Sequence, residues 1–245
     1  MAVSIERASL YERYRLPYAD EAVEDLLEHV GPVQVVADIG AGNGQLSRLF
    51  AGRCARLYAV EPEPAMREVA AAALADWPSV EIRGACAERT TLDDGSIDLI
   101  VVGNAFHRFR PEACDELRRI LRPEGWAALF SYSSTNKALD DMLADRLAAL
   151  KGARSRVARV WHGMPPEALF GEGRIHRRSY RQSRTDDWAA FFGAARAWLE
   201  APEPGDDEFG LFEKIYREVF EAFAADGGIK LEYETHVAFG RPRVS

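Results

Sequence analysis

The chain has 245 residues, of which 47% are hydrophobic and 29% are charged, and its formal net charge at pH 7 is -8. This composition is typical of a globular protein and excludes disordered, collagen-like and fibrous classes. The acidic balance also argues against a general nucleic-acid binder or a protein that docks on an anionic membrane.

The N-terminus and the cysteines indicate the expected compartment. The first residues lack the apolar core of a signal peptide, and no run of about 18 apolar residues occurs. The three cysteines, Cys54, Cys86 and Cys114, stand far apart, so neither a disulfide framework nor a metal site is expected. We therefore expect a cytoplasmic protein, either a monomer or a homodimer, with no metal, nucleic-acid partner or membrane partner.

Apolar spacing in the first 134 residues alternates between helical and strand patterns. In chain order it predicts a helix over 20–30, a strand over 33–39, a helix over 45–51, a strand over 56–60, a helix over 64–75, strands over 80–83 and 97–102, a helix over 111–121 and a strand over 126–132. Such alternation with nearly continuous apolar strands predicts an α/β fold with a parallel sheet covered on both faces.

The second half has a less regular pattern. It predicts a helix over 136–150, a strand over 174–184, helices over 186–200 and 208–225, and a last strand over 229–239. Parallel sheets bind ligands beyond the carboxyl ends of their strands. Candidate ligand residues are therefore expected just after Ile39, Val60, Arg83 and Val102.

A glycine-rich turn and an acidic residue follow the first two predicted strands. The turn reads DIGAGNG over 38–44, and Glu61 follows the next strand. Glycines allow a sharp turn and a close approach to a ligand, and an acidic side chain can bind both ribose hydroxyls of an adenosine. A dinucleotide fingerprint would have a third glycine where Gln45 stands, and Asp38 suits a cationic ligand better than a pyrophosphate. Glu61 itself is compatible with either ligand.

Further segments continue this pattern along the chain. They are VEPEPAM (60–66), GACAE (84–88), LDDGSIDLI (92–100), NAFHRF (104–109) and ELRRILRPEG (116–125). Their order and spacing resemble those of class I S-adenosylmethionine-dependent methyltransferases. The similarity is to the small-molecule branch, methyltransferase type 11, which includes trans-aconitate methyltransferase-like and quinone-biosynthesis enzymes. It covers residues 10–132.

The resemblance implies a fold and a domain organisation. The fold would be Rossmann-like and doubly wound, with seven mostly parallel strands, an antiparallel last strand, and helical cap insertions after the fifth and sixth strands. The single domain, 1–245, would comprise an N-terminal lid and helix (1–30), a cofactor-binding core (31–133), substrate-covering insertions around the sixth strand (134–228) and the last strand (229–245).

The resemblance also implies S-adenosylmethionine as cofactor and a role for individual residues. Near the methionine part of the cofactor would lie Asp38, Gly40, Ala41, Gly42, Asn104 and Ala105. Near its ribose and adenine would lie Glu61, Pro62, Met66, Ala87 and Glu88. The segment 11–18 is similar to the family's Tyr-x-x-Tyr-Arg-Pro-x-Tyr segment and would cover the cofactor, with Tyr14 and Arg15 nearest; an amphipathic tail is the alternative.

His107 is the candidate catalytic residue, because it follows the fourth strand on the side where the methyl group should point. It would act either as a general base near neutral pH or as a residue that shapes the pocket. Arg108 stands where the family often has tryptophan, so the shape and polarity of the substrate pocket differ here.

The predicted partner is a small-molecule acceptor. Residues 146–184 hold ten basic and two acidic residues, so the acceptor could be anionic; a solvated basic face is the alternative. Three other functions remain open: a nicotinamide-dependent oxidoreductase, a non-catalytic protein that binds S-adenosylmethionine, and, less well supported, an RNA methyltransferase.

Overall fold

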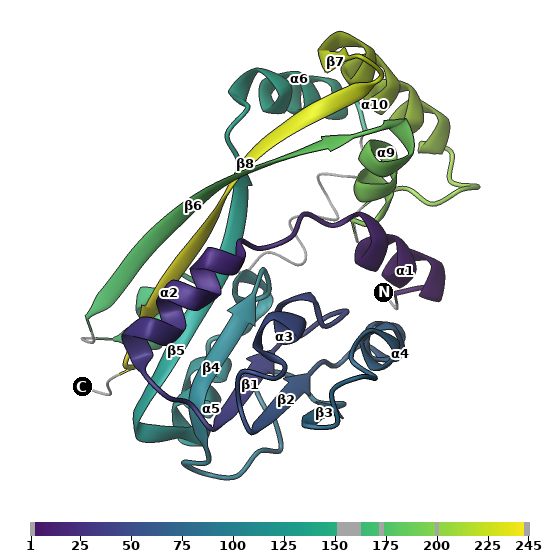
Figure 1. Ribbon diagram of the computed structural model, residues 1–245. Helices are drawn as coiled ribbons and strands as arrows, with labels where there is room; N and C mark the ends of the chain where they lie inside the picture. Colours follow the sequence, from purple (N-terminus) through teal and green to yellow (C-terminus); the bar gives the residue numbers. More distant parts are fainter. Residues whose placement is uncertain (1–2, 151–162, 172–173, 199–200, 243–245) are drawn as a thin grey trace.

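One twisted sheet runs through the molecule (Figure 1). The computed structural model describes residues 3–150, 163–171, 174–198 and 201–242. The strands are β1 (Val35–Ile39), β2 (Arg56–Val60), β3 (Val80–Arg83), β4 (Ile97–Gly103), β5 (Leu121–Ser134), β6 (Ile175–Asp186), β7 (Ala224–Ala225) and β8 (Gly228–Gly240). The order across the sheet is β3-β2-β1-β4-β5-β8-β6, and β7 pairs with β8 off this path.

The expected α/β class is confirmed. β1 to β5 pair in parallel, and β8 pairs antiparallel with both β5 and β6. The sheet has one strand more than the expected seven, because the chain after α10 makes a two-residue hairpin arm, β7, against β8.

Helices cover both faces of the sheet. They are α1 (Ile5–Tyr14), α2 (Asp20–Val30), α3 (Gln45–Phe50), α4 (Pro64–Ala73), the 3-10 helix η1 (Phe106–Arg108), α5 (Glu112–Ile120), α6 (Lys137–Leu147), α8 (Glu167–Phe170), α9 (Trp188–Arg196) and α10 (Phe209–Phe223). Val36 of β1 packs in one core with α2 and α3, whereas its neighbour Ala37 packs in a second core with α5 and α8. Alternate side chains of one strand thus enter opposite cores, as a doubly covered sheet requires.

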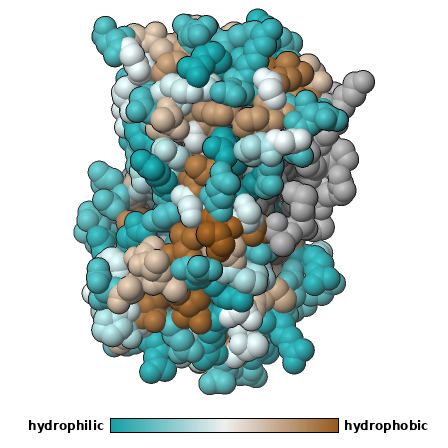
Figure 2. Space-filling model, turned by 90° about the vertical axis from the view of Figure 1, so that its right-hand side faces the viewer, coloured by the Kyte–Doolittle hydropathy of each residue, from teal (hydrophilic) through white to brown (hydrophobic). Residues whose placement is uncertain are grey.

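The expected cap insertions after the fifth and sixth strands are also present. α6 follows β5, and α9 and α10 lie between β6 and β8. These three helices share a separate core at the far ends of the long strands β6 and β8 (Figure 1). α1 contacts both α9 and α4 and so joins this cap to the sheet domain. Figure 2 shows hydrophobic side chains gathered about midway between the two ends of the molecule.

Several boundaries differ from the sequence predictions. α1 was not predicted as a helix, although the Ser4 side chain caps it by accepting a hydrogen bond from the N–H of Arg7. β5 begins at Leu121, directly after α5, because Leu121 pairs with Ile97 ahead of a register shift. The helices predicted over 186–200 and 208–225 extend over 188–196 and 209–223. The last two residues of the first of these, 199–200, lie outside the described residues.

A cluster of aromatic rings packs α2 against the sheet. The ring of His29 in α2 lies 4.5 Å from that of His176 in β6 and 5.0 Å from that of Phe239 in β8, measured between ring centroids. His176 also stacks on Phe239 at 5.1 Å. Burial lowers the pKa of His176, and the charges of His29 and nearby arginines lower it further.

This cluster predicts acid-sensitive stability. A histidine pKa that is lower in the folded chain than in the unfolded one contributes stability above the unfolded value of about 6.5, which is lost as the pH falls below it. The variant His176→Phe keeps the stacked ring but cannot take up a proton. We expect its melting temperature to fall less than that of the wild type between pH 7.5 and pH 5.5. Parallel pH dependence of the two proteins would contradict this role.

Candidate functional site

The glycine-rich turn after β1 adopts a conformation that requires glycine. Gly40, Gly42 and Gly44 have φ angles of 73°, 57° and 83°, a region that other residues rarely occupy. A Cβ on Gly40 would lie 2.7 Å from the Cβ of Ala105, whereas a Cβ on Gly42 would meet no atom within 4 Å. The turn is therefore packed on one side and open on the other.

The backbone of this turn is held by β2. The N–H groups of Gly40 and Ala41 donate to the Val60 carbonyl at 2.8 and 3.0 Å. The N–H of Gly42 donates to Oε2 of Glu61 at 2.9 Å. A glycine-rich turn between a strand and a helix can direct free N–H groups at a ligand, but here these three N–H groups bind the protein itself. The turn shapes the site through its open surface and through Glu61.

Glu61 links the ends of β1 and β2. Its side chain is buried, and Oε1 accepts a second hydrogen bond, 2.9 Å from the N–H of Glu63. Burial raises the pKa of Glu61. A carboxylate has about four acceptor positions, so two backbone donors leave it able to bind hydroxyl groups of a ligand. The Glu61 carboxylate therefore links the glycine turn to the loop after β2 and keeps acceptor positions for a ligand.

Asp38 lies directly beneath the turn and is fully buried. Its Oδ2 accepts a hydrogen bond from the Ser47 hydroxyl at 2.6 Å, whereas its Oδ1 has no partner among the described residues. Burial raises the pKa of Asp38 to about 7, and the charge of Glu61 contributes to the increase. An unsatisfied buried carboxylate oxygen is costly unless a ligand pairs with it. A cationic group bound at the turn would remove that cost.

The residues predicted to border an adenine lie around the loops after β2 and β3. Met66 is buried against Ala8 of α1, and Ala87 is buried in the core beside α5. Glu88 accepts a hydrogen bond from the N–H of Arg110 at 2.9 Å and so ties the loop after β3 to the chain after η1. Pro62, in contrast, is exposed.

The end of β4 brings Asn104 and Ala105 next to the glycine turn. Asn104 has a φ angle of 49°, which is uncommon for a residue other than glycine. Its N–H donates to the Phe130 carbonyl at 2.8 Å, and its side-chain Nδ2 is buried without a partner in the described part of the chain. Strained backbone and unsatisfied polar groups concentrate at functional sites.

The N-terminal segment covers this end of the sheet. The guanidinium of Arg15 lies over the ring of Tyr11 at 4.7 Å and over that of Tyr132 at 5.0 Å. Its Nε and the Tyr132 hydroxyl are buried and lack partners among residues 3–150, 163–171, 174–198 and 201–242. Tyr14 lies differently, because its ring packs on Gly193 of α9.

Tyr14 and Gly193 provide a direct test of how the lid is seated. A Cβ on Gly193 would overlap the Tyr14 ring. We expect Gly193→Ala to lower the free energy of unfolding by about 1–3 kcal/mol, because overpacking displaces α1 from α9. The matched control is Gly210→Ala, since Gly210 is also helical but has open space around it. That change should be neutral or raise stability by up to about 1 kcal/mol. Equal melting temperatures for both variants would contradict the contact.

Sequence reasoning missed several polar residues that hold these loops together. Glu12 of α1 pairs with Asn43 of the glycine turn and with Arg48 of α3. Arg67 donates from Nη1 to the carbonyls of Glu61 and Pro62 at 2.9 and 2.7 Å. Glu12 lies inside the predicted lid segment, and its charge was the one sequence feature that could have indicated a polar contact there. The sequence does not indicate that its partner is Arg48 of α3.

His107 lies on η1, next to the end of β4. Its Nε2 accepts a hydrogen bond from Nε of Arg108 at 3.4 Å. Burial lowers the pKa of His107 to about 4, and the positive charges of Arg108 and Arg15 contribute. His107 is therefore neutral at neutral pH, and because its Nε2 accepts from Arg108, its Nδ1 carries the proton and is the donor.

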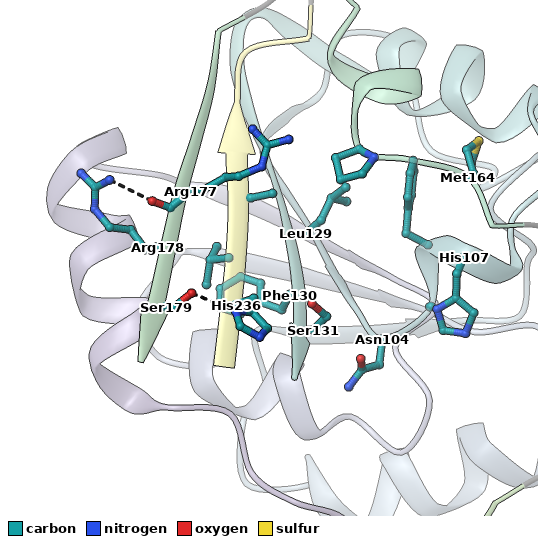
Figure 3. A pocket seen from close by; sticks show the side chains of 15 residues that line it. Asn104, His107, Leu129, Phe130, Ser131, Met164, Arg177, Arg178, Ser179 and His236 are labelled. Carbon is teal, nitrogen blue, oxygen red and sulfur yellow. Dashed lines mark hydrogen bonds between the residues drawn. The ribbon is translucent and has the colours of Figure 1, made fainter. Parts of the chain in front are cut away.

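A cavity of about 440 Å³ opens beside His107 (Figure 3). Asn104 and Ala105 line it together with His107, and its other walls come from β5, β6, β8 and residues 164–166. Because Ala105 touches Gly40, the cavity adjoins the glycine turn. The structure thus places the turn, the two acidic residues and this cavity at one edge of the sheet.

In the part of the chain that the structure describes, no three or more His, Cys, Asp or Glu side chains are grouped so as to hold a metal ion. Nor does any helix in that part combine the length and apolar character needed to cross a bilayer.

The chain is similar in sequence to known methyltransferases. Residues 37–129 match the family model described as a methyltransferase domain. An uncharacterised methyltransferase of Mycobacterium tuberculosis is 40% identical over 116 residues, which are 47% of this chain and 46% of that protein. An uncharacterised methyltransferase of Schizosaccharomyces pombe is 32% identical over 123 residues, 49% of this chain and 48% of that protein. The matches thus span about half the length of these relatives.

Solved structures show the same fold over most of the chain. The YcgJ protein of Bacillus subtilis has a TM-score of 0.61 at 18% identity, covering 93% of this chain and 100% of that one. A protein described as a type II methyltransferase from Anaeromyxobacter dehalogenans has a TM-score of 0.60 at 24% identity, covering 93% and 97%. Residues 37–129 thus match the methyltransferase domain family in sequence, and most of the chain has the fold that these solved structures share.

Proposed function

We propose that this protein transfers the methyl group of S-adenosylmethionine to a small-molecule acceptor. The observation that supports this most strongly is the pair of buried carboxylates at neighbouring strand ends. Asp38 has an oxygen without a partner, and Glu61 is bound to the glycine turn. A cationic ammonium and two ribose hydroxyls fit these groups, and both occur in this cofactor. The nicotinamide-dependent oxidoreductase receives no support from the matched proteins.

In this proposal each predicted site residue has a role in binding. Glu61 accepts hydrogen bonds from the ribose, and Asp38 orients the ammonium group. Gly40, Ala41 and Gly42 leave room for the methionine part, and Asn104 and Ala105 lie beneath it. Pro62, Met66, Ala87 and Glu88 border the adenine. Tyr14 and Arg15 belong to the covering segment.

The bound cofactor supplies a methyl group that its sulfonium already activates for in-line displacement. The protein's own contribution is to orient the acceptor and to exclude water. His107, with a pKa of about 4, is a weak base, because a general base works best with a pKa near the operating pH. We therefore favour positioning of the acceptor as its role. The acceptor's nucleophilic atom would face the methyl group between Asn104 and His107.

The structure also bears on the charge of the acceptor. Arginines of the basic stretch pair with carboxylates: Arg146 with Glu218, Arg177 with Glu167, Arg181 with Glu234, and Arg184 with Asp186. These pairs favour the interpretation of the stretch as a surface balanced by acidic neighbours. Residues 151–162, which carry four further basic residues of the stretch, lie outside the described residues.

Thermal unfolding with added ligands tests the proposal. A ligand present at 100 times its dissociation constant stabilises by about 2.7 kcal/mol, which raises the melting temperature of a chain this size by about 5–10 °C. We expect this increase with S-adenosylmethionine and with S-adenosylhomocysteine but not with NADH or NADPH. An increase with a nicotinamide nucleotide alone would overturn the proposal.

A further inference from the structure

Three polar side chains form a row across the floor of the cavity. Ser131 of β5 pairs in register with His236 of β8, which in turn pairs with Ser179 of β6. All three line the cavity, and Figure 3 shows Ser179 directed at His236. They come from strands far apart in the sequence and meet only because β8 lies between β5 and β6. We refer to them as the serine–histidine row.

Hydrogen bonds orient this row. Nδ1 of His236 lies 2.8 Å from the Ser179 hydroxyl, and its Nε2 lies 2.8 Å from the hydroxyl of Ser133. A neutral imidazole donates from one nitrogen and accepts at the other. One serine therefore donates to the ring and the other accepts from it, and both ring nitrogens are occupied. Whichever way the proton lies, the Ser179 hydroxyl keeps at least one acceptor position for a neighbouring molecule, and Ser131 adds a second hydroxyl to the cavity wall.

The remaining walls are mainly apolar. The cavity is also lined by the apolar side chains of Leu129, Met164, Pro166 and Phe106. The volume of about 440 Å³ falls in the range of small-molecule sites, about 300–1,000 Å³. Such walls exclude water and favour a ligand that is mostly apolar.

Two arginines line the cavity, and one of them is paired with a carboxylate. The Arg177 side chain lies over the cavity, but its guanidinium pairs with Glu167 of α8. Arg178 points away and donates to the Arg177 carbonyl at 3.0 Å. No acidic side chain is among the described residues that line the cavity. An anionic ligand group would compete with Glu167 for the Arg177 guanidinium, and a cationic one would meet no carboxylate among the described lining residues, where an unpaired buried charge is costly.

We propose that this cavity is the acceptor site and that it takes an apolar molecule with an uncharged hydroxyl or carbonyl end, held by the serine–histidine row. The cavity reaches the glycine turn through Ala105, so the opposite part of the same molecule faces the cofactor site. This inference rests on the proposed function, because it needs a cofactor at that turn.

Matched probes separate the contribution of charge from that of shape. We would use 3-phenylpropyl, 2-(2-naphthyl)ethyl and n-octyl bodies, each ending in a hydroxyl, a carboxylate or an ammonium group. Binding would be measured by calorimetry at saturating S-adenosylhomocysteine. We expect at least one alcohol to bind more tightly than both of its charged counterparts.

Variants then assign the binding to the row and the cavity. Ser179→Ala should weaken alcohol binding by about 3- to 10-fold through the loss of one hydrogen bond. Ala238→Leu, which fills the cavity from β8, should abolish it. The matched control is Ser183→Ala, because Ser183 is an exposed serine on the same face of β6 outside the cavity. All three variants should bind S-adenosylhomocysteine as the wild type does, which shows that they fold.

Each alternative result has a definite meaning. Carboxylates that bind as well as the alcohols and lose affinity in Arg177→Ala would overturn the uncharged class in favour of an anionic acceptor. Tightest binding of the ammonium series would also overturn it. Binding of S-adenosylhomocysteine with no probe bound would overturn the assignment of the cavity. Absence of S-adenosylhomocysteine binding, in contrast, would overturn the proposed function itself.

Discussion

Replacement of Glu61 by glutamine should weaken S-adenosylmethionine binding by about 10- to 100-fold. Glu61 holds the N–H groups of Gly42 and Glu63 with its two oxygens. Glutamine would turn its amide N–H₂ toward one of these donors and lose one charge-assisted acceptor for the ribose, and each such loss costs about 1.5–3 kcal/mol. Calorimetric titration with S-adenosylmethionine and S-adenosylhomocysteine measures the change directly.

The control for this experiment lies two residues away. Glu63→Gln removes a neighbouring carboxylate but keeps the backbone N–H that Glu61 accepts. The affinity of this variant for S-adenosylmethionine should stay within about twofold of that of the wild type. The Glu63 carboxylate takes no part in the hydrogen bond between the two residues, and such a charge contributes little. Equal loss in both variants would show that the loop's net charge, rather than the geometry of Glu61, determines binding.

The second large effect concerns Asp38 and pH. Because its pKa in the folded chain is raised to about 7, the folded state binds this proton more tightly than the unfolded state, where the value is about 3.9. Its contribution to the stability of the ligand-free protein is therefore present at low pH and is lost as the pH rises through 7. Cofactor binding should show the opposite trend, since only the ionised carboxylate attracts an ammonium group. Affinity should increase from pH 6 to pH 8.

The variant Asp38→Asn separates these two trends. Without a titrating group, the ligand-free variant should be more stable than the wild type at pH 8 and should have a flatter stability profile. Its cofactor affinity should be about 10- to 100-fold lower at pH 8, because a charge-assisted hydrogen bond is lost, and it should no longer depend on Asp38 ionisation. Asp76→Asn is the control, since Asp76 is exposed. A wild-type affinity that does not change between pH 6 and pH 8 would contradict the role of Asp38.

Local patterns predicted much of the fold correctly. The strands over 56–60 and 80–83 agree with β2 and β3 to the residue, and the helix over 20–30 agrees with α2. These elements have continuous apolar runs or a clear helical period, and glycine or proline marks their ends. α1 has neither signal, since half of its ten residues are charged or serine and its packing partners α4 and α9 are distant in the sequence.

The sequence also indicated where the site residues would meet. Asp38 lies near the end of β1, and Glu61 and Asn104 follow β2 and β4. Parallel strands end at the same edge of a sheet, so the proximity of these residues follows from chain order alone. The protonation and hydrogen bonding of these residues do not follow from chain order. The unpaired Oδ1 of Asp38 and the lowered pKa of His107 depend on what surrounds each group in three dimensions.

The sequence by itself thus determined the alternation of strands and helices, the glycine turn and its acidic partners, because each depends on neighbouring residues. The tertiary structure alone decided how Glu12 joins the lid to α3, how Arg15 lies between Tyr11 and Tyr132, and how Ser131, His236 and Ser179 form a row. These contacts depend on the register of strands and on the packing of helices separated by long stretches of chain. No local pattern encodes such register, because it results from the simultaneous burial of many side chains.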